Sequence, residues 1–297
     1  MNKYILTEEL IRSFIKPREK FSHKGTYGHA LIVAGSYGKM GAAILAAKAC
    51  LRSGVGLLTI HVPQKGYEII QTSVPEAIVE IDKNSFSSSQ GIDADVYSAV
   101  GIGPGLGNNE FTEYTLKQLL LSTNKPMVLD ADALNIISLN KDILKMIPAN
   151  SILTPHPKEF ERLTKKTVNS IERHQMQIEF SRLHHVYVLL KGADTCITTP
   201  EGISYFNSTG NSGLAKGGSG DVLTGIITSL LAQGYAPLQA SLIGAYVHGL
   251  SADLLKTKKG EIGMIPSDVI ESLPEAFLKL SNIKEEKANL QKKNRNH

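Results

Sequence analysis

Residues 30–62 read ALIVAGSYGKMGAAILAAKACLRSGVGLLTIHV, and this stretch decides the fold class. The apolar run 30–34 predicts a buried strand, and the glycine-rich segment 35–41 predicts a tight loop. The Ala- and Leu-rich run 42–52 predicts a helix that ends at Gly54, where glycine is the preferred terminating residue. A second apolar strand follows at 56–62. A strand, a helix and a strand at this spacing form a βαβ unit, which builds a parallel sheet.

The same alternation continues along the chain. Further strands are predicted at 99–102, 126–130, 151–154 and 186–190, with a hairpin at 196–199 and 202–206. Further helices are predicted at 110–121, 171–183, 221–233, 238–255 and 266–279. We therefore expect one domain over residues 1–281, an α/β fold in which a mostly parallel sheet lies between two helical layers. Residues 82–95 are expected to form a surface loop, and the charged tail 282–297 is expected to be disordered.

Composition excludes several classes of protein. Hydrophobic residues make up 42% of the 297 residues and charged residues 20%, as is usual for a globular protein. No apolar run approaches the roughly 20 residues that span a bilayer, and the first residues lack a signal-peptide pattern, so we expect a cytoplasmic protein without a membrane partner. The net charge of +4 comes mainly from the tail, and tryptophan is absent, so nucleic-acid binding is not expected. Cys50 and Cys196 are too few for a disulfide framework.

The most informative stretch for function is NSGLAKGGSGDVLTG at 211–225, a glycine-rich loop that runs into an apolar helix. Gly218, Ser219 and Gly220 stand where the first backbone N–H groups of the helix lack intrahelical acceptors, so this turn is suited to binding a phosphate. Asp221 follows at once. Its carboxylate can cap the helix, or it can accept the proton of a hydroxyl group that attacks phosphorus. The spacing alone leaves both roles open.

Four other stretches follow predicted strands, where ligands of such sheets gather. They are the glycine-rich segments 35–43 and 101–107, the segment TPHPKE at 154–159, and KGADT at 191–195. His156 is either a solvated side chain in a stiff loop or a substrate contact. Glu159 is either a helix N-terminal acid or a ligand of hydrated Mg²⁺. Lys191 either neutralises phosphate or merely opens a hairpin.

Asp130 and Asp132 also follow a strand. They either shape the site or bind a metal ion through water, or they have a structural role as a helix cap or at the strand end. The glycine spacings fail the dinucleotide-binding pattern of Rossmann oxidoreductases, and the P-loop, zinc-site and nucleophile-elbow patterns are absent.

Two resemblances connect these motifs. Residues 218–221 resemble the Gly-x-Gly-Asp signature of ribokinase-like kinases, and residues 215–225 resemble more closely the NAD(P)H-hydrate dehydratases, the carbohydrate kinase-like domain of YjeF proteins. All five stretches match motifs of that family in the same order, and the resemblance covers about residues 8–275. It implies a ribokinase-like fold and the stand-alone form of the enzyme, without a fused epimerase domain.

The resemblance also implies an activity. It is the dehydration of the S-epimer of hydrated NADH or NADPH, driven by ADP or ATP with Mg²⁺, in an enzyme that is a lyase and a homotetramer. The family's catalytic group corresponds to Asp221 with Gly218, Ser219 and Gly220. Its nucleotide-binding group corresponds to Lys191, Gly192, Ala193, Asp194, Thr195 and Gly220. Its substrate-binding group corresponds to Ala43, Gly105, His156 and Asp221, and the metal ligands stay open, with Glu159 as a candidate through water.

Two alternatives are considered. A small-molecule kinase of the same fold, for a vitamin precursor or a sugar, would share the Gly-Ser-Gly-Asp turn but not the other motifs. A catalytically silent nucleotide-binding regulator would not need Asp221.

Overall fold

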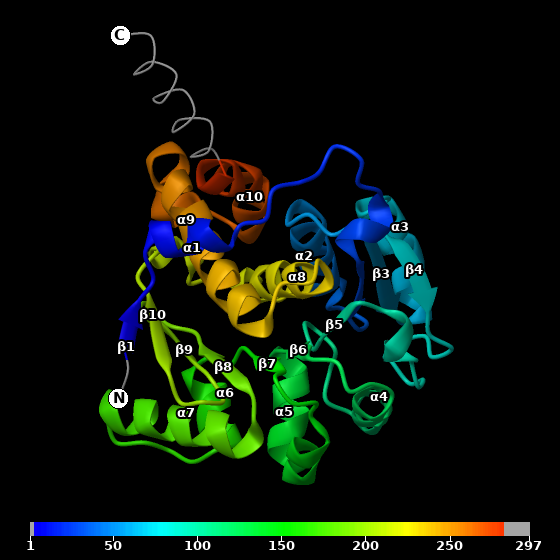
Figure 1. The fold of residues 1–297 in the computed structure, drawn as a ribbon. Helices are drawn as coiled ribbons and strands as arrows, with labels where there is room; N and C mark the ends of the chain where they lie inside the picture. The colour runs from blue at the N-terminus through cyan, green and yellow to red at the C-terminus, as the bar shows by residue number, and fades with distance from the viewer. Residues whose placement is uncertain (1–2, 282–297) are drawn as a thin grey trace, which may run out of the picture.

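One ten-stranded sheet runs through the structure, a computed structural model that describes residues 3–281 (Figure 1). The strand order is β1-β10-β9-β8-β7-β6-β5-β2-β3-β4. The strands are β1 (Lys3–Ile5), β2 (His29–Val33), β3 (Leu57–Val62), β4 (Ile78–Ile81), β5 (Ala99–Ile102), β6 (Met127–Leu129), β7 (Ile152–Leu153), β8 (Tyr187–Leu190), β9 (Thr195–Thr198) and β10 (Ser204–Asn207). Every neighbouring pair is parallel except the two pairs that β9 forms with β8 and β10. The predicted mostly parallel sheet is confirmed.

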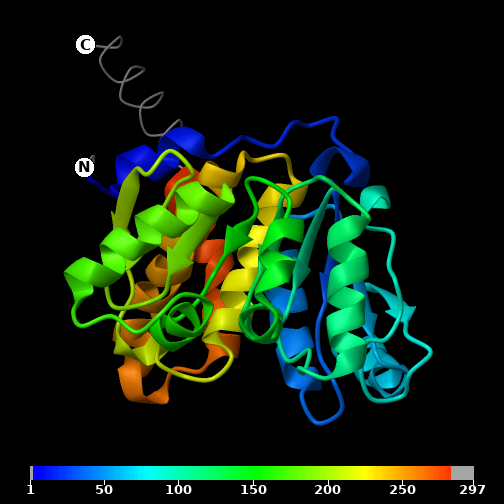
Figure 2. The same ribbon diagram turned by 90° about the horizontal axis from the view of Figure 1, so that it is seen from below.

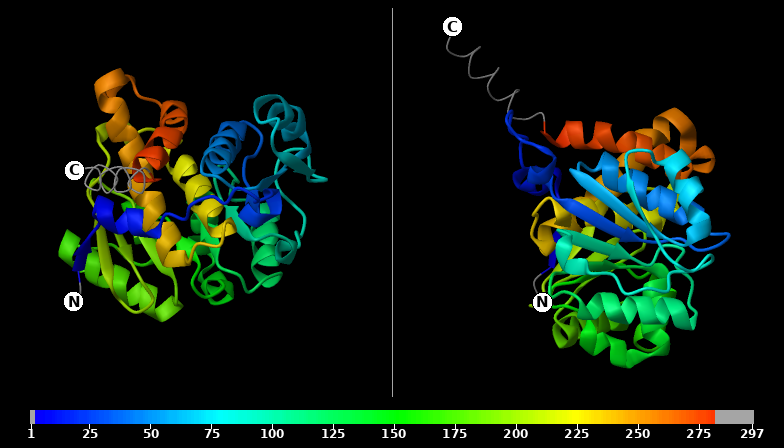
Figure 3. Two further views of the ribbon diagram at one scale, coloured as in Figure 1. Left: turned by 45° about the horizontal axis from the view of Figure 1, so that its top comes forward. Right: turned by 90° about the vertical axis from the view of Figure 1, so that its right-hand side faces the viewer.

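Helices cover both faces of the sheet (Figure 1). The helices are α1 (Glu8–Phe14), α2 (Met40–Arg52), α3 (Tyr67–Ser73), α4 (Glu110–Leu121), α5 (Ala131–Leu139), α6 (Pro157–Leu163), α7 (Ser170–His184), α8 (Ser219–Ala232), α9 (Pro237–Gly263) and α10 (Pro266–Ser281). Helices α4 to α7 form one layer, which lies in front in Figure 2, and the others lie on the opposite face, as the right-hand view of Figure 3 shows.

The alternation of side chains along β2 explains the two layers. Ala30 and Ile32 belong to the larger apolar core, under α2, α8 and α9, whereas Leu31 and Val33 belong to the second core, under α4 and α5. Successive residues of a strand point to opposite faces, so an uninterrupted apolar strand requires cover on both sides. The three-layer α/β/α arrangement predicted from the sequence follows from this.

The structure adds elements that the sequence did not reveal. Strand β4 completes one edge of the sheet, but its residues are exposed or half-buried, so it lacks the apolar signal of the inner strands. Helix α6 begins at Pro157, where a stiff loop was one of the two interpretations. Helix α8 begins at Ser219, two residues earlier than predicted, which places Asp221 inside its first turn.

Two other expectations concern irregular segments. Residues 82–95 form a loop apart from a short 3-10 helix at Ala94–Val96, but Asp82 is only 1% exposed, so the loop is anchored in the interior. The tail 282–297 lies outside the described residues. Among residues 3–281, no helix combines the length and the apolar character needed to cross a membrane.

Parallel pairing brings the predicted site together. The segments that follow β2, β5, β6, β7 and β8 all leave the sheet at its carboxyl edge. This edge is where open parallel sheets bind their ligands.

Candidate active site

The start of α8 has free backbone donors and a glycine at its N-terminus. Gly218 is its N-terminal capping residue with φ of +100°, a conformation that favours glycine, and a Cβ at this position would come within 2.7 Å of Leu45. No side chain caps the helix. Among the described residues, the backbone N–H groups of Gly220 and Asp221 have no acceptor. These donors and the positive end of the helix dipole are therefore available to a phosphoryl group.

Asp221 does not cap this helix. In the part of the chain that the structure describes, its carboxylate forms no hydrogen bond and no ion pair, whereas a capping carboxylate would accept a backbone N–H. Burial, reinforced by the neighbouring charges of Asp130 and Asp132 and opposed by Lys191, raises the pKa of Asp221 to about 7. A carboxylate with a pKa near neutrality is a competent general base. Of the two roles that the sequence left open, the structure thus removes capping.

Lys191 links three elements at this site. At the end of β8, its ammonium group lies 2.7 Å from Asp130 Oδ1, and Thr224 of α8 donates a 2.7 Å hydrogen bond to Asp130 Oδ2. A Cβ placed on Gly220 would be 3.2 Å from the Lys191 nitrogen, so the cation lies beside the anion-binding turn. Asp130 is 1% exposed and does not cap α5. It holds Lys191 in place, which is consistent with a role in shaping the site and leaves no role as a helix cap.

His156 and Glu159 form a reciprocal capping box at the start of α6. His156 Nδ1 accepts the backbone N–H groups of Lys158 and Glu159, both at 3.1 Å, and Glu159 Oε2 accepts the His156 N–H at 2.7 Å. Because Nδ1 accepts, the ring proton is on Nε2, 3.4 Å from Glu159 Oε1. His156 is therefore a fixed donor with its side chain 45% exposed, not a freely solvated histidine.

The same contacts bear on a metal site. The Glu159 side chain is 7% exposed and is occupied by the capping box and by Lys191, 3.9 Å away, so the helix N-terminal interpretation of Glu159 holds. Within residues 3–281, no group of three His, Cys, Asp or Glu side chains converges as a metal cage. The side chains at this site therefore fit only a Mg²⁺ ion whose ligands are mostly water molecules and phosphate oxygens.

Residues 191–195 form the turn of the β8–β9 hairpin. Leu190 pairs with Cys196, and residues 192–194 are exposed. The Thr195 hydroxyl donates to the Gly192 carbonyl at 3.2 Å, and a Cβ on Gly192 would meet no atom within 4 Å. The two interpretations of residues 191–195, a hairpin turn and a nucleotide-binding segment, are therefore compatible. The backbone of the turn is exposed, so a ligand that lies beside Gly220 toward β8 could reach it.

Gly105 lies in the loop that follows β5, where it packs against the loop that follows β2 and the start of α2. Its φ is +60°, and a Cβ would lie 2.9 Å from both the Lys39 carbonyl and Ala42. The Ser36 hydroxyl donates to its carbonyl at 2.8 Å. Ala43, the predicted substrate contact, is different: its side chain is fully buried against Gly35, and the neighbouring Ala42 is the one that faces Gly105.

Asp132 connects these loops. Its Oδ2 accepts the Gly107 N–H at 2.8 Å and lies 3.3 Å from the Lys39 ammonium group, while its Oδ1 accepts from Asn135. Asp132 thus holds the two glycine-rich loops together.

One residue at the site gave no sequence signal. His248 lies inside a predicted helix, where nothing in the local pattern distinguishes it. Thr224 lies within the stretch 211–225, but no role was assigned to it from the sequence. Burial and the charge of Lys191 lower the pKa of His248 to about 4, and a hydrogen bond with the Ser219 backbone offsets this only in part. His248 is therefore a neutral ring behind the first turn of α8.

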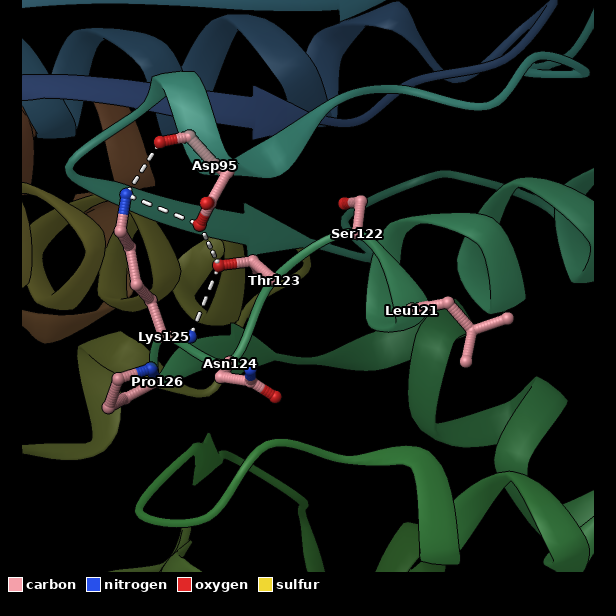
Figure 4. A pocket seen from close by; sticks show the side chains of 7 residues that line it. All are labelled: Asp95, Leu121, Ser122, Thr123, Asn124, Lys125 and Pro126. Carbon is pink, nitrogen blue, oxygen red and sulfur yellow. Dashed lines mark hydrogen bonds and ion pairs between the residues drawn. The ribbon is translucent and has the colours of Figure 1, made fainter.

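The hollow drawn in Figure 4 is not this site. It is lined by Asp95 and residues 121–126, just before β6, so it lies at the amino edge of the sheet. Its polar groups bind one another: Thr123 donates to Asp95 at 2.8 Å, and Lys125 donates to the Asp95 carbonyl at 2.6 Å.

Comparison with known proteins agrees with this geometry. A family model described as NAD(P)H-hydrate dehydratase matches residues 30–275. The chain is 35% identical over 279 residues to the ADP-dependent (S)-NAD(P)H-hydrate dehydratase of Bacillus subtilis, covering 93% of this chain and 99% of that protein. It is 38% identical over 296 residues to the bifunctional NAD(P)H-hydrate repair enzyme Nnr of Moorella thermoacetica, covering 96% of this chain and 55% of that protein. The chain thus spans about half the length of the bifunctional relatives it matches.

Solved structures give the same result. The crystal structure of the Bacillus subtilis ADP/ATP-dependent NAD(P)H-hydrate dehydratase, co-crystallised with ATP and Mg²⁺, has a TM-score of 0.83 at 33% identity and covers 95% of this chain and 100% of that one. Ribokinase from Thermotoga maritima has a TM-score of 0.54 at 15% identity, covering 83% of this chain and 99% of that one, which shows the ribokinase-like fold alone. On this sequence match and this site, the chain belongs to the NAD(P)H-hydrate dehydratase family.

Proposed function

We propose that this protein dehydrates the S-epimer of hydrated NADH or NADPH at the expense of ADP or ATP, acting as a hydro-lyase. One observation carries the proposal. Within residues 3–281, the Asp221 carboxylate in the first turn of α8 is unpaired, and the backbone N–H groups beside it have no acceptor. A proton acceptor next to an anion-binding turn is the arrangement that phosphoryl transfer to a hydroxyl group requires.

The reaction then assigns a role to each group. Asp221 takes the proton of the hydroxyl group on C6 of the hydrated ring, and that oxygen attacks the terminal phosphoryl group of the nucleotide. The N–H groups of Gly220 and Asp221 stabilise the charge that develops on the transferred group, and Lys191 adds a fixed positive charge. Phosphate leaves from C6 and a proton leaves from C5, which restores the ring double bond. The products are NADH or NADPH, phosphate, and AMP from ADP or ADP from ATP.

The two ligands meet at the start of α8 in this proposal. The nucleotide lies along residues 191–195 and Gly220. The hydrated ring lies near Gly105, His156 and Asp221, with the start of α2, including Ala43, behind it. Mg²⁺ neutralises phosphate charge when it is bound with the nucleotide. The homotetramer implied by the resemblance and the cytoplasmic location expected from the sequence pattern stay predictions.

The test follows reduced nicotinamide by its near-ultraviolet absorbance as the protein meets hydrated NADH with Mg²⁺ and either ADP or ATP. We expect an absorbance increase that requires nucleotide, matched by equimolar phosphate. Asp221→Asn should abolish it, and Asp142→Asn, which alters an exposed acid paired with Lys145, should not. The faster nucleotide identifies the phosphoryl donor. A stable phosphorylated product would instead identify a kinase, and folded protein without turnover would contradict the proposal.

A further inference from the structure

Two exposed aromatic rings stand at the same sheet edge as the active site. The rings of Tyr37 and Phe86 lie edge to face, with centroids 5.2 Å apart and planes at 87°. Tyr37 is 70% exposed and Phe86 is 56% exposed. Both follow parallel strands, Tyr37 after β2 and Phe86 after β4, so both lie at the carboxyl edge of the sheet.

The pair is held rigidly, although its rings face solvent. The backbone N–H of Tyr37 donates to the Phe86 carbonyl at 2.9 Å, which joins the two loops directly. The residues after Phe86, Ser87 and Ser88, are buried. Two aromatic rings are thus fixed in one geometry at the surface. Because both rings are largely exposed, a role in the apolar core does not explain why aromatic residues stand there.

Asp82 anchors the loop that carries Phe86 to the interior of the protein. This carboxylate is 1% exposed and accepts the backbone N–H groups of Asn84 at 2.7 Å, Ser89 at 2.7 Å and Gln90 at 3.2 Å. On its inner side, Asp82 Oδ2 lies 3.0 Å from Nε2 of the fully buried His61. The position of Phe86 is therefore set by a buried ion pair and does not depend on a ligand.

The loop that carries Tyr37 also forms one wall of the active site. Ser36 donates to the Gly105 carbonyl, and the backbone of Lys39 packs against Gly105. The aromatic pair is thus continuous with the side of the site that lies toward β2, β3 and β4. Residues 191–195 lie in the opposite direction along the sheet, beyond β5, β6 and β7.

We propose that Tyr37 and Phe86 form a stacking platform for the adenine ring of the dinucleotide substrate. The inference rests on the proposed function, because only a dinucleotide has an adenosine half that extends beyond the reacting ring. With the phosphoryl donor on the β8 side of Gly220, this half must leave the site toward β2 and β4. A base can stack on an aromatic side chain without any hydrogen bond to the protein, so stacking can hold the adenine ring at an exposed edge of the site.

The test compares two ligands that share the reduced nicotinamide end. NADH carries the adenosine half, and reduced nicotinamide mononucleotide lacks it. We expect Tyr37→Ala and Phe86→Ala to weaken NADH binding in titration calorimetry by roughly 5- to 150-fold, the range for loss of one stacked base. Binding of the mononucleotide should not change. Tyr37→Phe should bind NADH like the wild type, since it keeps the ring. Phe21→Ala is the matched control, because Phe21 is 91% exposed but precedes β2, at the opposite edge of the sheet.

Catalysis provides a second readout. With the hydrated dinucleotide, both alanine variants should raise KM and leave kcat nearly unchanged. If the wild type binds NADH but does not dehydrate the hydrate, the proposed function fails and the binding comparison still decides the platform. Three results would overturn the platform proposal. In the first, the alanine variants weaken the binding of both ligands equally. In the second, NADH binding does not change, and in the third, the wild type binds NADH no more tightly than the mononucleotide. A change of assembly state in both variants would assign the rings to a contact between copies.

Discussion

The ammonium group of Lys191 lies 2.7 Å from Asp130 Oδ1, so a cation from the end of β8 is fixed by an acid from the end of β6. Asp130 also accepts from Thr224, one turn after Asp221. Three segments that are distant in the sequence are thereby locked around the start of α8. The pKa of Asp221 depends on these contacts, because the charge of Asp130 raises it and the charge of Lys191 lowers it.

The first prediction concerns the pH dependence of turnover. Asp221 must be ionised to accept a proton, and burial raises its pKa to about 7. We expect kcat/KM to increase about tenfold per pH unit below this value and to level off above it. The measurement is kcat/KM across pH 5–9 at saturating nucleotide. A profile that is flat from pH 5 upward would contradict the role of Asp221 as base.

Removal of Lys191 should move that profile. Without the cation, the Asp221 carboxylate loses a favourable charge and its pKa increases further, so the acid limb should shift upward by about 1 pH unit. Lys191→Met is the variant. Lys141→Met is the control, because Lys141 is exposed and, among the residues that the structure describes, its ammonium group binds only the Thr164 carbonyl. A downward shift of the limb would show that Lys191 does not act on Asp221.

Asp221 should cost the protein stability at neutral and alkaline pH. An acid whose folded-state pKa is raised contributes stability below its unfolded pKa of about 4, and this is lost as pH increases through about 7. Asp221→Asn should therefore increase the free energy of unfolding by about 2 kcal/mol at pH 8, with solvent screening taken into account. It should give little gain at pH 4. Urea denaturation at the two pH values checks this, and destabilisation of the variant at pH 8 would contradict it.

The close packing of α2 and α8 should depend on Gly225. A Cβ at this position would collide with the Ala46 carbonyl oxygen, a backbone atom that cannot move away alone. We expect Gly225→Ala to destabilise the protein by about 1–3 kcal/mol, as overpacking does. Gly217→Ala is the control, since a Cβ on Gly217 would meet no atom within 4 Å. Chemical denaturation measures both, and equal stabilities would show that the two helices can separate at little cost.

The buried pair of His61 and Asp82 should make stability depend on pH. Burial lowers the pKa of His61, but hydrogen bonds with Asp82 and Glu80 outweigh this and raise it overall. The contribution of His61 is thus fully present below its unfolded pKa of about 6.5 and is lost as pH increases through the higher folded-state pKa. The pKa of Asp82 is lowered in spite of its burial, by His61 and Ser89 among others, so Asp82 loses its contribution only as pH falls below about 4.

His61→Gln should therefore be most destabilising between about pH 4 and pH 6.5, by about 3 kcal/mol, the cost of breaking a buried pair. The difference from the wild type should shrink toward pH 9. Denaturation of both proteins across this range measures it. A difference that grows with pH would show that His61 is neutral in the folded protein.

Much of the fold is local in origin and could therefore be predicted. The apolar strands, the Ala-rich helix and the glycine at its end each act within a few residues, so 30–62 alone indicates a parallel sheet with cover on both faces. The order of the motifs also predicted which residues gather at the site, because parallel strands end at one edge. Strand β4 was missed, since an edge strand need not be apolar.

Only the tertiary structure decided what the charged groups do. Whether Asp130 holds a lysine and whether Glu159 is free for a metal depend on atoms that are 32 to 94 residues apart in the chain. That the Asp221 side chain does not cap its helix is likewise visible only in the folded structure. His248 gave no sequence signal, because its lowered pKa results from burial and from its contacts with Lys191 and the start of α8, which are distant in the chain. The sequence by itself determined which polar segments follow a strand and which glycines let the backbone turn. The packed structure determined the distances, and electrostatic interaction and desolvation follow distance and burial, not sequence position.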